Sequence, residues 1–285
     1  MSHGAIFLCA VLWSTAGLFI KLIDWHPMVI AGCRSLLAAG LLFALRYFSN
    51  RKKNVRDFHA MIKEAPKLSA CGLCYTATMI LFIFANKMTA SANAILLQYT
   101  APVWAALLGW FFLKEKPRWE NWFALVFVCM GMFMVFSCGL AAGSLAGDML
   151  AILSGILFAA NSVVLRARKD SNTADILFYA HLLCVIFSIP FFFVYPPTLT
   201  VQSVLCIGFL GIFQLGVASA LFAYGIKRVP AVQAMLTATI EPVLNPVWVL
   251  FVTGERPGIR VITGGAIIIA AVLFSSMLSA LRRRN

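Results

Sequence analysis

The sequence predicts an all-α membrane protein with ten transmembrane helices, arranged as two inverted repeats of five helices with both termini in the cytoplasm (N-in/C-in). Three observations support this fold class: an apolar composition, the recurrence of membrane-length apolar runs, and an internal repeat. Of the 285 residues, 62% are hydrophobic and 12% are charged, whereas soluble domains contain about 25% charged residues. The chain is therefore expected to fold in a lipid bilayer.

Ten apolar runs are long enough to cross a bilayer, which takes about 20 helical residues for a hydrocarbon core of about 30 Å. We expect helices because a backbone in lipid must satisfy its own hydrogen bonds, and because the runs lack the alternation of barrel strands. Residues 49–67 are expected to form a hydrophilic loop on the anionic inner surface of the membrane. The expected spans are 4–23, 27–48, 68–86, 91–113, 120–138, 147–165, 174–194, 203–226, 230–252 and 260–281.

The basic residues are concentrated on one side of the predicted bundle. The formal net charge is +13, and eighteen of the 23 Lys and Arg residues lie in or beside segments expected to face the cytoplasm. This bias follows the positive-inside rule and predicts that both termini face the cytoplasm, so the charge does not indicate binding of nucleic acid. We expect a multi-pass protein of the plasma (inner) membrane. The five others are Lys21, Lys87, Arg256 and Arg260 toward the opposite side, and Arg34 within a span.

The cysteines give no indication of a metal or a cofactor. All eight are scattered, most of them through apolar spans, and Cys71 and Cys74 form a single CxxC pair without a second one. A structural zinc site needs four ligands, so we interpret these thiols as small buried hydrophobic groups. No HExxH motif, nucleotide-binding loop or catalytic pair of aspartates is present, and an enzyme is not expected.

The two halves of the chain match each other at an offset of 140 residues. Pro102 aligns with Pro242, and Glu115 aligns with Glu255. A weaker match, at a slightly different offset, sets residues 13–21 against residues 158–166. The main alignment places LQYTAPVWAALLGWFFLKEKP (97–117) over TATIEPVLNPVWVLFVTGERP (237–257).

This repeat predicts two five-helix units, residues 1–140 and 141–285. Because five is odd, the second unit would enter the membrane from the opposite side. Inverted repeats of this kind are a common plan of secondary transporters, whose two halves move around a central site. A duplicated scaffold without transport is the alternative.

An ionisable acid lies near the middle of the ninth expected span. Glu241 is about eleven residues, or roughly 16 Å, from the cytoplasmic end, where a carboxylate costs about 2.5–3.5 kcal/mol. One expectation is that Glu241 binds substrate, a proton or a cation. The alternative is a structural role, in which Glu241 stays protonated and hydrogen-bonds a neighbouring helix, or pairs with Arg34. Its neighbours on the same helix face include Thr237, Asn245 and Trp248.

Prolines interrupt the same span. Pro242 and Pro246 each lack an N–H group, which should free carbonyls about one turn earlier, near Ala238 and Pro242, and bend the helix. Freed carbonyls at mid-membrane can bind a cation or a donor group, or provide a flexing point. We assign Pro242, Pro246 and the equivalent Pro102 a gating or structural role.

The arrangement of motifs resembles the EamA-type branch of the drug/metabolite transporter superfamily. The resemblance lies in LWSTAGLFIK (12–21), HPMVIAGCR (26–34), Glu241-Pro242, and the proline, apolar run, glutamate and basic residue of the fourth and ninth helices. It implies a five-plus-five inverted fold with a cavity built mainly from helices 1, 3, 4, 6, 8 and 9, and transport of amino acids and other small metabolites. Ala101 departs from the pattern, because it stands where the second half has Glu241.

Further candidate residues lie on these presumed cavity helices. Aromatic rings with a few amides would hold an amphipathic zwitterion or, by cation–π contact, an ammonium group. Arg34, its inferred counterpart His181, and the helix-end residues Glu115 and Glu255 are assigned gating or structural roles. The substrate candidates are Trp13, Ser14, Tyr75, Phe82, Gln98, Tyr99, Asn161, Gln214 and Tyr224.

The leading hypothesis is a secondary transporter of small polar or amphipathic metabolites. It would export amino acids or related compounds by alternating access, as a monomer or a homodimer. Coupling to protons or to another cation is left open. The alternatives are uptake of a cationic amine or a nucleobase-bearing metabolite, and, from other classes, an intramembrane enzyme, a channel or a scaffold. A channel is disfavoured because no selectivity-filter repeat is found.

Overall fold

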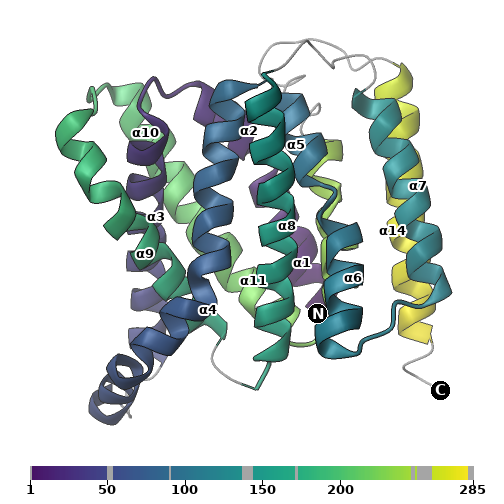
Figure 1. Ribbon diagram of the computed structural model, residues 1–285, viewed down its shortest axis with the longest axis horizontal. Coiled ribbons are helices and arrows are strands. Elements are labelled where there is room, and N and C mark those ends of the chain that lie inside the picture. The colour runs from purple at the N-terminus through teal and green to yellow at the C-terminus, as the bar shows by residue number, and fades with distance from the viewer. Residues whose placement is uncertain are drawn as a thin grey trace.

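A computed structural model describes residues 2–49, 54–89, 91–136, 144–170, 173–244, 248 and 259–281. These residues form a bundle of helices without strands (Figure 1). The helices of the first half are α1 (Ser2–Trp13), α2 (Ala16–Lys21), α3 (Pro27–Ser49), α4 (Asn54–Met88), α5 (Ser91–Gln98), α6 (Ala101–Leu113) and α7 (Trp119–Phe136). Those of the second half are α8 (Leu145–Ala167), α9 (Thr173–Val194), α10 (Val201–Phe209), the π-helix η1 (Leu210–Val217), α11 (Ala218–Ile226), α12 (Ala231–Ala238) and α14 (Ile259–Leu281).

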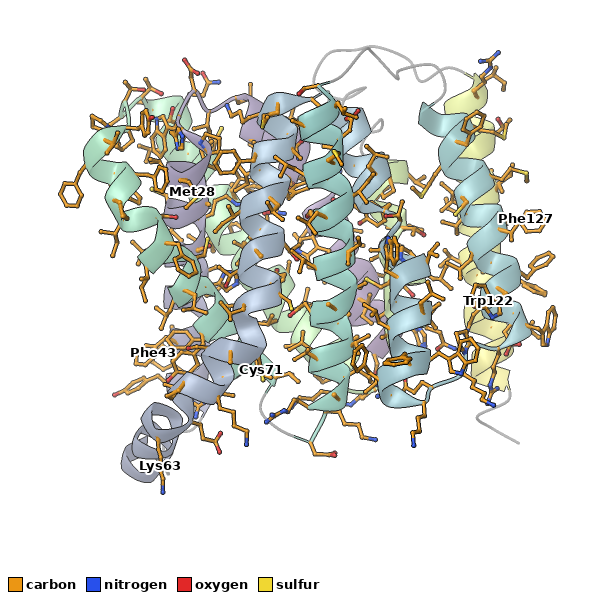
Figure 2. All side chains as sticks on the ribbon, viewed as in Figure 1. Met28, Phe43, Lys63, Cys71, Trp122 and Phe127 are labelled. Atoms are coloured by element: carbon orange, nitrogen blue, oxygen red, sulfur yellow. The ribbon has the colours of Figure 1, made fainter. Side chains whose placement is uncertain are left out.

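Each expected span contains helix, and the all-α prediction is confirmed for the described residues. Within the described residues, six helical stretches are long and apolar enough to cross a membrane, the longest being Lys63–Met88 and Val201–Ile226. The outer surface carries large apolar side chains, including Phe43 and Trp122 in Figure 2. On a soluble protein an apolar surface of this extent would be a liability, whereas lipid solvates it.

The predicted loop at 49–67 is wrong for most of its length. Helix α4 begins at Asn54, and residues 54–67 continue directly into the third span. Lys63 lies on this extension, which projects beyond the rest of the bundle in Figure 2. The prediction relied on hydrophilicity, and a polar helix outside the hydrocarbon region has the same composition as a loop.

In the part of the chain that the structure describes, three of the spanning segments are interrupted near their middle. The first breaks at Ser14 and Thr15, the fourth at Tyr99 and Thr100, and the ninth at Thr239, after which residues 240–244 are helical again. The second and third breaks are equivalent in the repeat and precede Pro102 and Pro242. Each proline removes the N–H that would bond the carbonyl four residues earlier, so the expected interruption of the ninth span is observed.

The carbonyl that Pro102 frees, that of Gln98, lies against a glycine of α8. A Cβ atom on Gly155 would come within 2.5 Å of the Gln98 carbonyl oxygen. The absence of a side chain at Gly155 therefore lets α8 approach the break in the fourth span.

We expect Gly155→Ala to destabilise the protein, because the added methyl group would meet a backbone carbonyl that cannot rotate away. Overpacking of this kind costs about 1–3 kcal/mol. Thermal unfolding in detergent should show a clear decrease in Tm, with Gly208→Ala in α10 as the matched control, since a Cβ on Gly208 meets nothing within 4 Å. Equal Tm values for the two variants would contradict this account of Gly155.

The helices pack in a pattern that repeats between the halves. Helix α3 packs on α9, α6 on α12, and α7 on α14, each pair combining equivalent spans of the two halves. Helix α4 packs on α8, and the equivalent contact in the repeat is that of α1 with α11. Figure 1 shows α7 and α14 side by side at one edge of the bundle. The centre is therefore built from both halves.

Polar contacts tie the helices together at both ends of the bundle. At the end where α6 and α8 terminate, Arg166 Nε donates to Glu115 Oε1 at 2.9 Å and Arg166 Nη1 donates to the Lys227 carbonyl at 2.7 Å. At the other end, Lys87 Nζ donates to the Ile23 carbonyl at 2.7 Å and Trp25 Nε1 to the Thr198 carbonyl at 2.8 Å. At each end, one of these contacts joins the two halves of the chain.

Candidate substrate site

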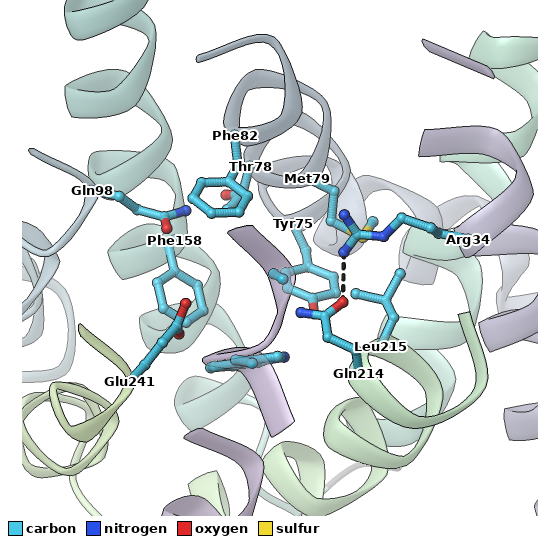
Figure 3. A pocket seen from close by; sticks show the side chains of 12 residues that line it. Arg34, Tyr75, Thr78, Met79, Phe82, Gln98, Phe158, Gln214, Leu215 and Glu241 are labelled. Carbon is cyan, nitrogen blue, oxygen red and sulfur yellow. Dashed lines mark hydrogen bonds between the residues drawn. The ribbon is translucent and has the colours of Figure 1, made fainter. Parts of the chain in front are cut away.

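A cavity of about 60 Å³ lies at the centre of the bundle (Figure 3). It can hold a few water molecules and is far smaller than the roughly 300–1,000 Å³ of small-molecule sites. A metabolite can therefore enter only if the helices separate. The walls come from both halves: Trp13, Ala16, Arg34, Tyr75, Thr78, Met79, Phe82 and Gln98 from the first, and Phe158, Gln214, Leu215 and Glu241 from the second.

Glu241 enters this cavity from just after the break in the ninth span. Its side chain is buried, and its carboxylate accepts a hydrogen bond from the Tyr99 hydroxyl. The same hydroxyl lies 3.0 Å from the carbonyl oxygen of Ala238, the group that Pro242 leaves without a helical partner. A tyrosine from the equivalent break of the other half therefore lies within hydrogen-bond distance of the carbonyl that Pro242 was predicted to free.

The arrangement around Tyr99 accommodates both protonation states of Glu241. An ionised carboxylate can only accept, so it takes the hydroxyl hydrogen of Tyr99. A protonated carboxyl can donate to the Tyr99 oxygen, which leaves the hydroxyl hydrogen for Ala238.

Arg34 reaches the cavity from α3, on the side opposite Glu241 in Figure 3. Arg34 is 4% exposed, and its Nη2 donates to Gln214 Oε1 at 2.8 Å. Among the described residues, neither Nε nor Nη1 has a hydrogen-bond partner. No ion pair in that part of the chain joins Arg34 to Glu241, so the hypothesis of a direct Glu241–Arg34 pair is wrong in this conformation.

A small polar cluster adjoins the cavity beside Arg34. The hydroxyl of Tyr75 lies 3.4 Å from Ser219 Oγ, and His181 Nε2 lies 3.1 Å from the same oxygen. The rings of Tyr75 and His181 meet edge to face at 5.6 Å. His181 is fully buried and does not line the cavity.

Several predicted substrate residues lie together on the cavity wall. These are Trp13, Tyr75, Phe82, Gln98, Gln214 and Glu241. The Trp13 ring packs on Phe158 and Phe222, with centroids 5.3 Å from each. Gln98 Nε2 donates to Ser154 Oγ of α8 at 2.9 Å.

Other predicted residues lie near the cavity without lining it. Tyr99 donates to Glu241, Thr237 donates to the Gln233 carbonyl of its own helix at 2.9 Å, and Trp248 Nε1 donates to Ser14 Oγ at 2.6 Å. Asn161 is fully buried in α8 without a side-chain hydrogen bond among the described residues. Tyr224 is 43% exposed with the Arg228 guanidinium above its ring, and it lies outside the wall of the central cavity.

The predicted gating and structural residues are dispersed. Glu115 bonds Arg166 rather than its neighbour Lys116, and Pro102 is in the first turn of α6. Pro242 is in the short helix after the break of the ninth span. Asn245, Pro246 and Glu255 fall outside the described residues.

The sequence reasoning missed part of the wall. Phe158 aligns with Trp13 in the weaker repeat match, so the repeat contained a signal for it. Arg34 was predicted to have a gating or structural role because its long side chain could extend outward to the membrane interface. Nothing in the sequence distinguished Ala16, Thr78, Met79 and Leu215 from ordinary packing residues.

Comparison with known proteins agrees with this architecture. The sequence profile of the EamA-like transporter family matches the chain twice, over residues 2–137 and 145–277. The chain belongs to the EamA-like transporter family. An EamA chain is a multi-pass membrane transporter and not an enzyme, and its small-molecule substrate is not specified by family membership.

Individual relatives of this EamA protein extend over nearly its whole length. An uncharacterized transporter of Archaeoglobus fulgidus is 25% identical over 288 residues, covering 96% of this chain and 97% of the relative. The S-adenosylmethionine uptake transporter of Rickettsia bellii is 26% identical, covering 87% and 83%. A solved crystal structure at 18% identity superposes with a TM-score of 0.82, covering 100% of this chain and 98% of the other, which supports the fold.

Proposed function

We propose that this protein is a secondary transporter that exports small polar or amphipathic metabolites, amino acids or related compounds, by alternating access. The observation that carries the proposal is the central cavity, whose wall combines both halves and holds a buried acid and a buried base. Intramembrane ionisable residues are expensive and usually functional. The cavity is too small for a metabolite in this conformation, so the two halves are proposed to separate when substrate enters.

The proposed orientation is N-in/C-in, with two inverted units at residues 1–140 and 141–285. The repeated packing of α3 on α9 and of α7 on α14 supports such units. Within the described chain, the end near Glu115 carries Lys114, Arg166 and Lys227, and the positive-inside rule assigns it to the cytoplasm.

Glu241 is proposed to carry a proton or bind the cationic group of a substrate. Its hydrogen bond from Tyr99 connects the breaks of the fourth and ninth spans. Unwound segments at mid-membrane are where transporters place substrate and coupling-ion sites. Protonation of the carboxyl would alter the contact between these two breaks, which is a means of coupling a proton to movement of the halves.

Uptake of a cationic or nucleobase-bearing metabolite is the second candidate. The Rickettsia bellii relative is an S-adenosylmethionine uptake transporter, and the aromatic wall formed by Trp13, Phe82 and Phe158 offers faces on which a base or a cation could stack.

Counterflow in proteoliposomes tests the proposed function. The liposomes are loaded with an excess of one unlabelled compound, either an amino acid or S-adenosylmethionine, and exposed to a trace of its labelled form. We expect transient, saturable accumulation with at least one compound, because a carrier with alternating access exchanges substrate. Entry without saturation would indicate a channel, and the absence of exchange across amino acids, amines and nucleosides would overturn the proposal.

A further inference from the structure

We infer that Arg34 is the anion-binding group of the central site, and that the transported compound therefore carries a carboxylate. The inference rests on the proposed transport function and specifies the substrate class of the same site. It changes the role expected for Arg34 from gate to specificity determinant.

The donors of Arg34 are largely unused. A guanidinium carries five N–H donors, and among the described residues only Nη2 makes a hydrogen bond, to Gln214 at 2.8 Å. Nε and Nη1 are buried without a partner, on a side chain that lines the cavity. Burial of a charge without compensating bonds is costly, and a structural arginine would be expected to satisfy these donors within the protein.

The chemistry of the guanidinium selects the missing partner. Its planar fork matches a carboxylate, which can accept two parallel hydrogen bonds. The protein supplies no such group to Arg34 within the described chain, since the one cavity-lining acid is Glu241 and it is bonded to Tyr99. A substrate carboxylate would complete the site.

Gln214 holds Arg34 toward the cavity. It lies in the π-helix η1, and such bulges occur frequently at functional sites because they redirect side chains. A Cβ atom placed on Gly211 of the same segment would lie 3.1 Å from the carbonyl oxygen of Arg34. The π-helix and α3 are therefore in close contact, and we assign Gln214 as a positioning residue for Arg34.

Glu241 and Arg34 together form two poles on opposite sides of one cavity (Figure 3). A compound with an ammonium or sulfonium group near a carboxylate would place its cation beside Glu241 and its carboxylate beside Arg34. Compounds with a cation alone would leave Arg34 unpaired. The geometry thus selects zwitterions over simple amines.

Matched ligands test the requirement for a carboxylate. Counterflow of labelled amino acids and S-adenosylmethionine is measured in the presence of competitors that lack the carboxylate. The competitors are the decarboxylated amines and, for the amino acids, also their amides. We expect the carboxylate-free member of each exchanged pair to compete at least tenfold more weakly. Equal competition by the two members of a pair would overturn the role of Arg34 without affecting the proposal of transport. If no compound is exchanged at all, the transport proposal is overturned, and this inference with it.

Variants of the pair supply a second measurement. Arg34→Met together with Gln214→Leu removes the charge and its partner, and should reduce carboxylate exchange at least tenfold without lowering the Tm in detergent. Gln214→Glu gives Arg34 a permanent internal carboxylate and should also reduce exchange, while raising the Tm. Cys33→Ala, adjacent on α3 and not on the cavity wall, is the control with normal exchange. A lower Tm with normal exchange in the double variant would assign Arg34 a structural role.

Discussion

Replacement of Glu241 by glutamine is expected to reduce counterflow about 100-fold while leaving expression and Tm near the wild-type values. Glutamine keeps the shape of the side chain and can still accept the Tyr99 hydrogen bond, but it carries neither charge nor an ionisable proton. A hydrogen bond to a charged group is worth about 1.5–3 kcal/mol, and each 1.4 kcal/mol changes affinity tenfold. Initial rates of counterflow at several pH values give the measurement.

The pH dependence separates the two roles proposed for Glu241. A carboxyl that carries the coupled proton makes transport respond to a pH gradient, and glutamine should remove that response. Glu64→Gln is the matched control, because Glu64 is exposed on the extension of α4 outside the cavity. If Glu241→Gln transports like the wild type at every pH, the acid has a structural role only.

Trp13→Ala should produce the largest loss of stability among the cavity residues. The indole packs between Phe158 of α8 and Phe222 of α11, with ring centroids at 5.3 Å, and it therefore joins the first span to two helices of the second half. Truncation of a buried aromatic residue to alanine costs about 3–5 kcal/mol. We expect a large decrease in Tm in detergent, accompanied by loss of substrate exchange.

A second tryptophan provides the comparison for this variant. Trp110 on α6 is 51% exposed toward the surrounding lipid or detergent, so Trp110→Ala removes the same atoms without opening a cavity in the core. Its Tm should remain near that of the wild type. Equal decreases for the two variants would mean that the contacts of Trp13 with Phe158 and Phe222 do not stabilise the bundle.

The features that were predictable from the sequence are those set locally. Apolar length indicated the spans, and the missing N–H group of Pro242 indicated that the ninth span departs from a regular helix near its middle. The freed Ala238 carbonyl followed from the same chemistry. The alignment of the two halves also predicted that both would contribute to the centre.

The remaining features depend on contacts between distant segments. Tyr99 and Glu241 are 142 residues apart, and Arg34 and Gln214 are 180 residues apart, so no local pattern could pair them. In the sequence, the residues of the π-helix at 210–217 have the same apolar pattern as an ordinary span. The helix that replaces the expected loop at residues 54–67 was missed because hydropathy measures polarity and not backbone conformation.

Accessibility of the central cavity from each side tests alternating access most directly. Ala16 lines the cavity and has a small side chain, so Ala16→Cys can be introduced after replacement of the eight native cysteines. A membrane-impermeant thiol reagent is then applied separately to inside-out and right-side-out vesicles. We predict reaction from both sides, slowed by an exchanged substrate on either side. Reaction from one side only, or a rate that substrate leaves unchanged, would contradict a single central site that opens alternately to the two faces of the membrane.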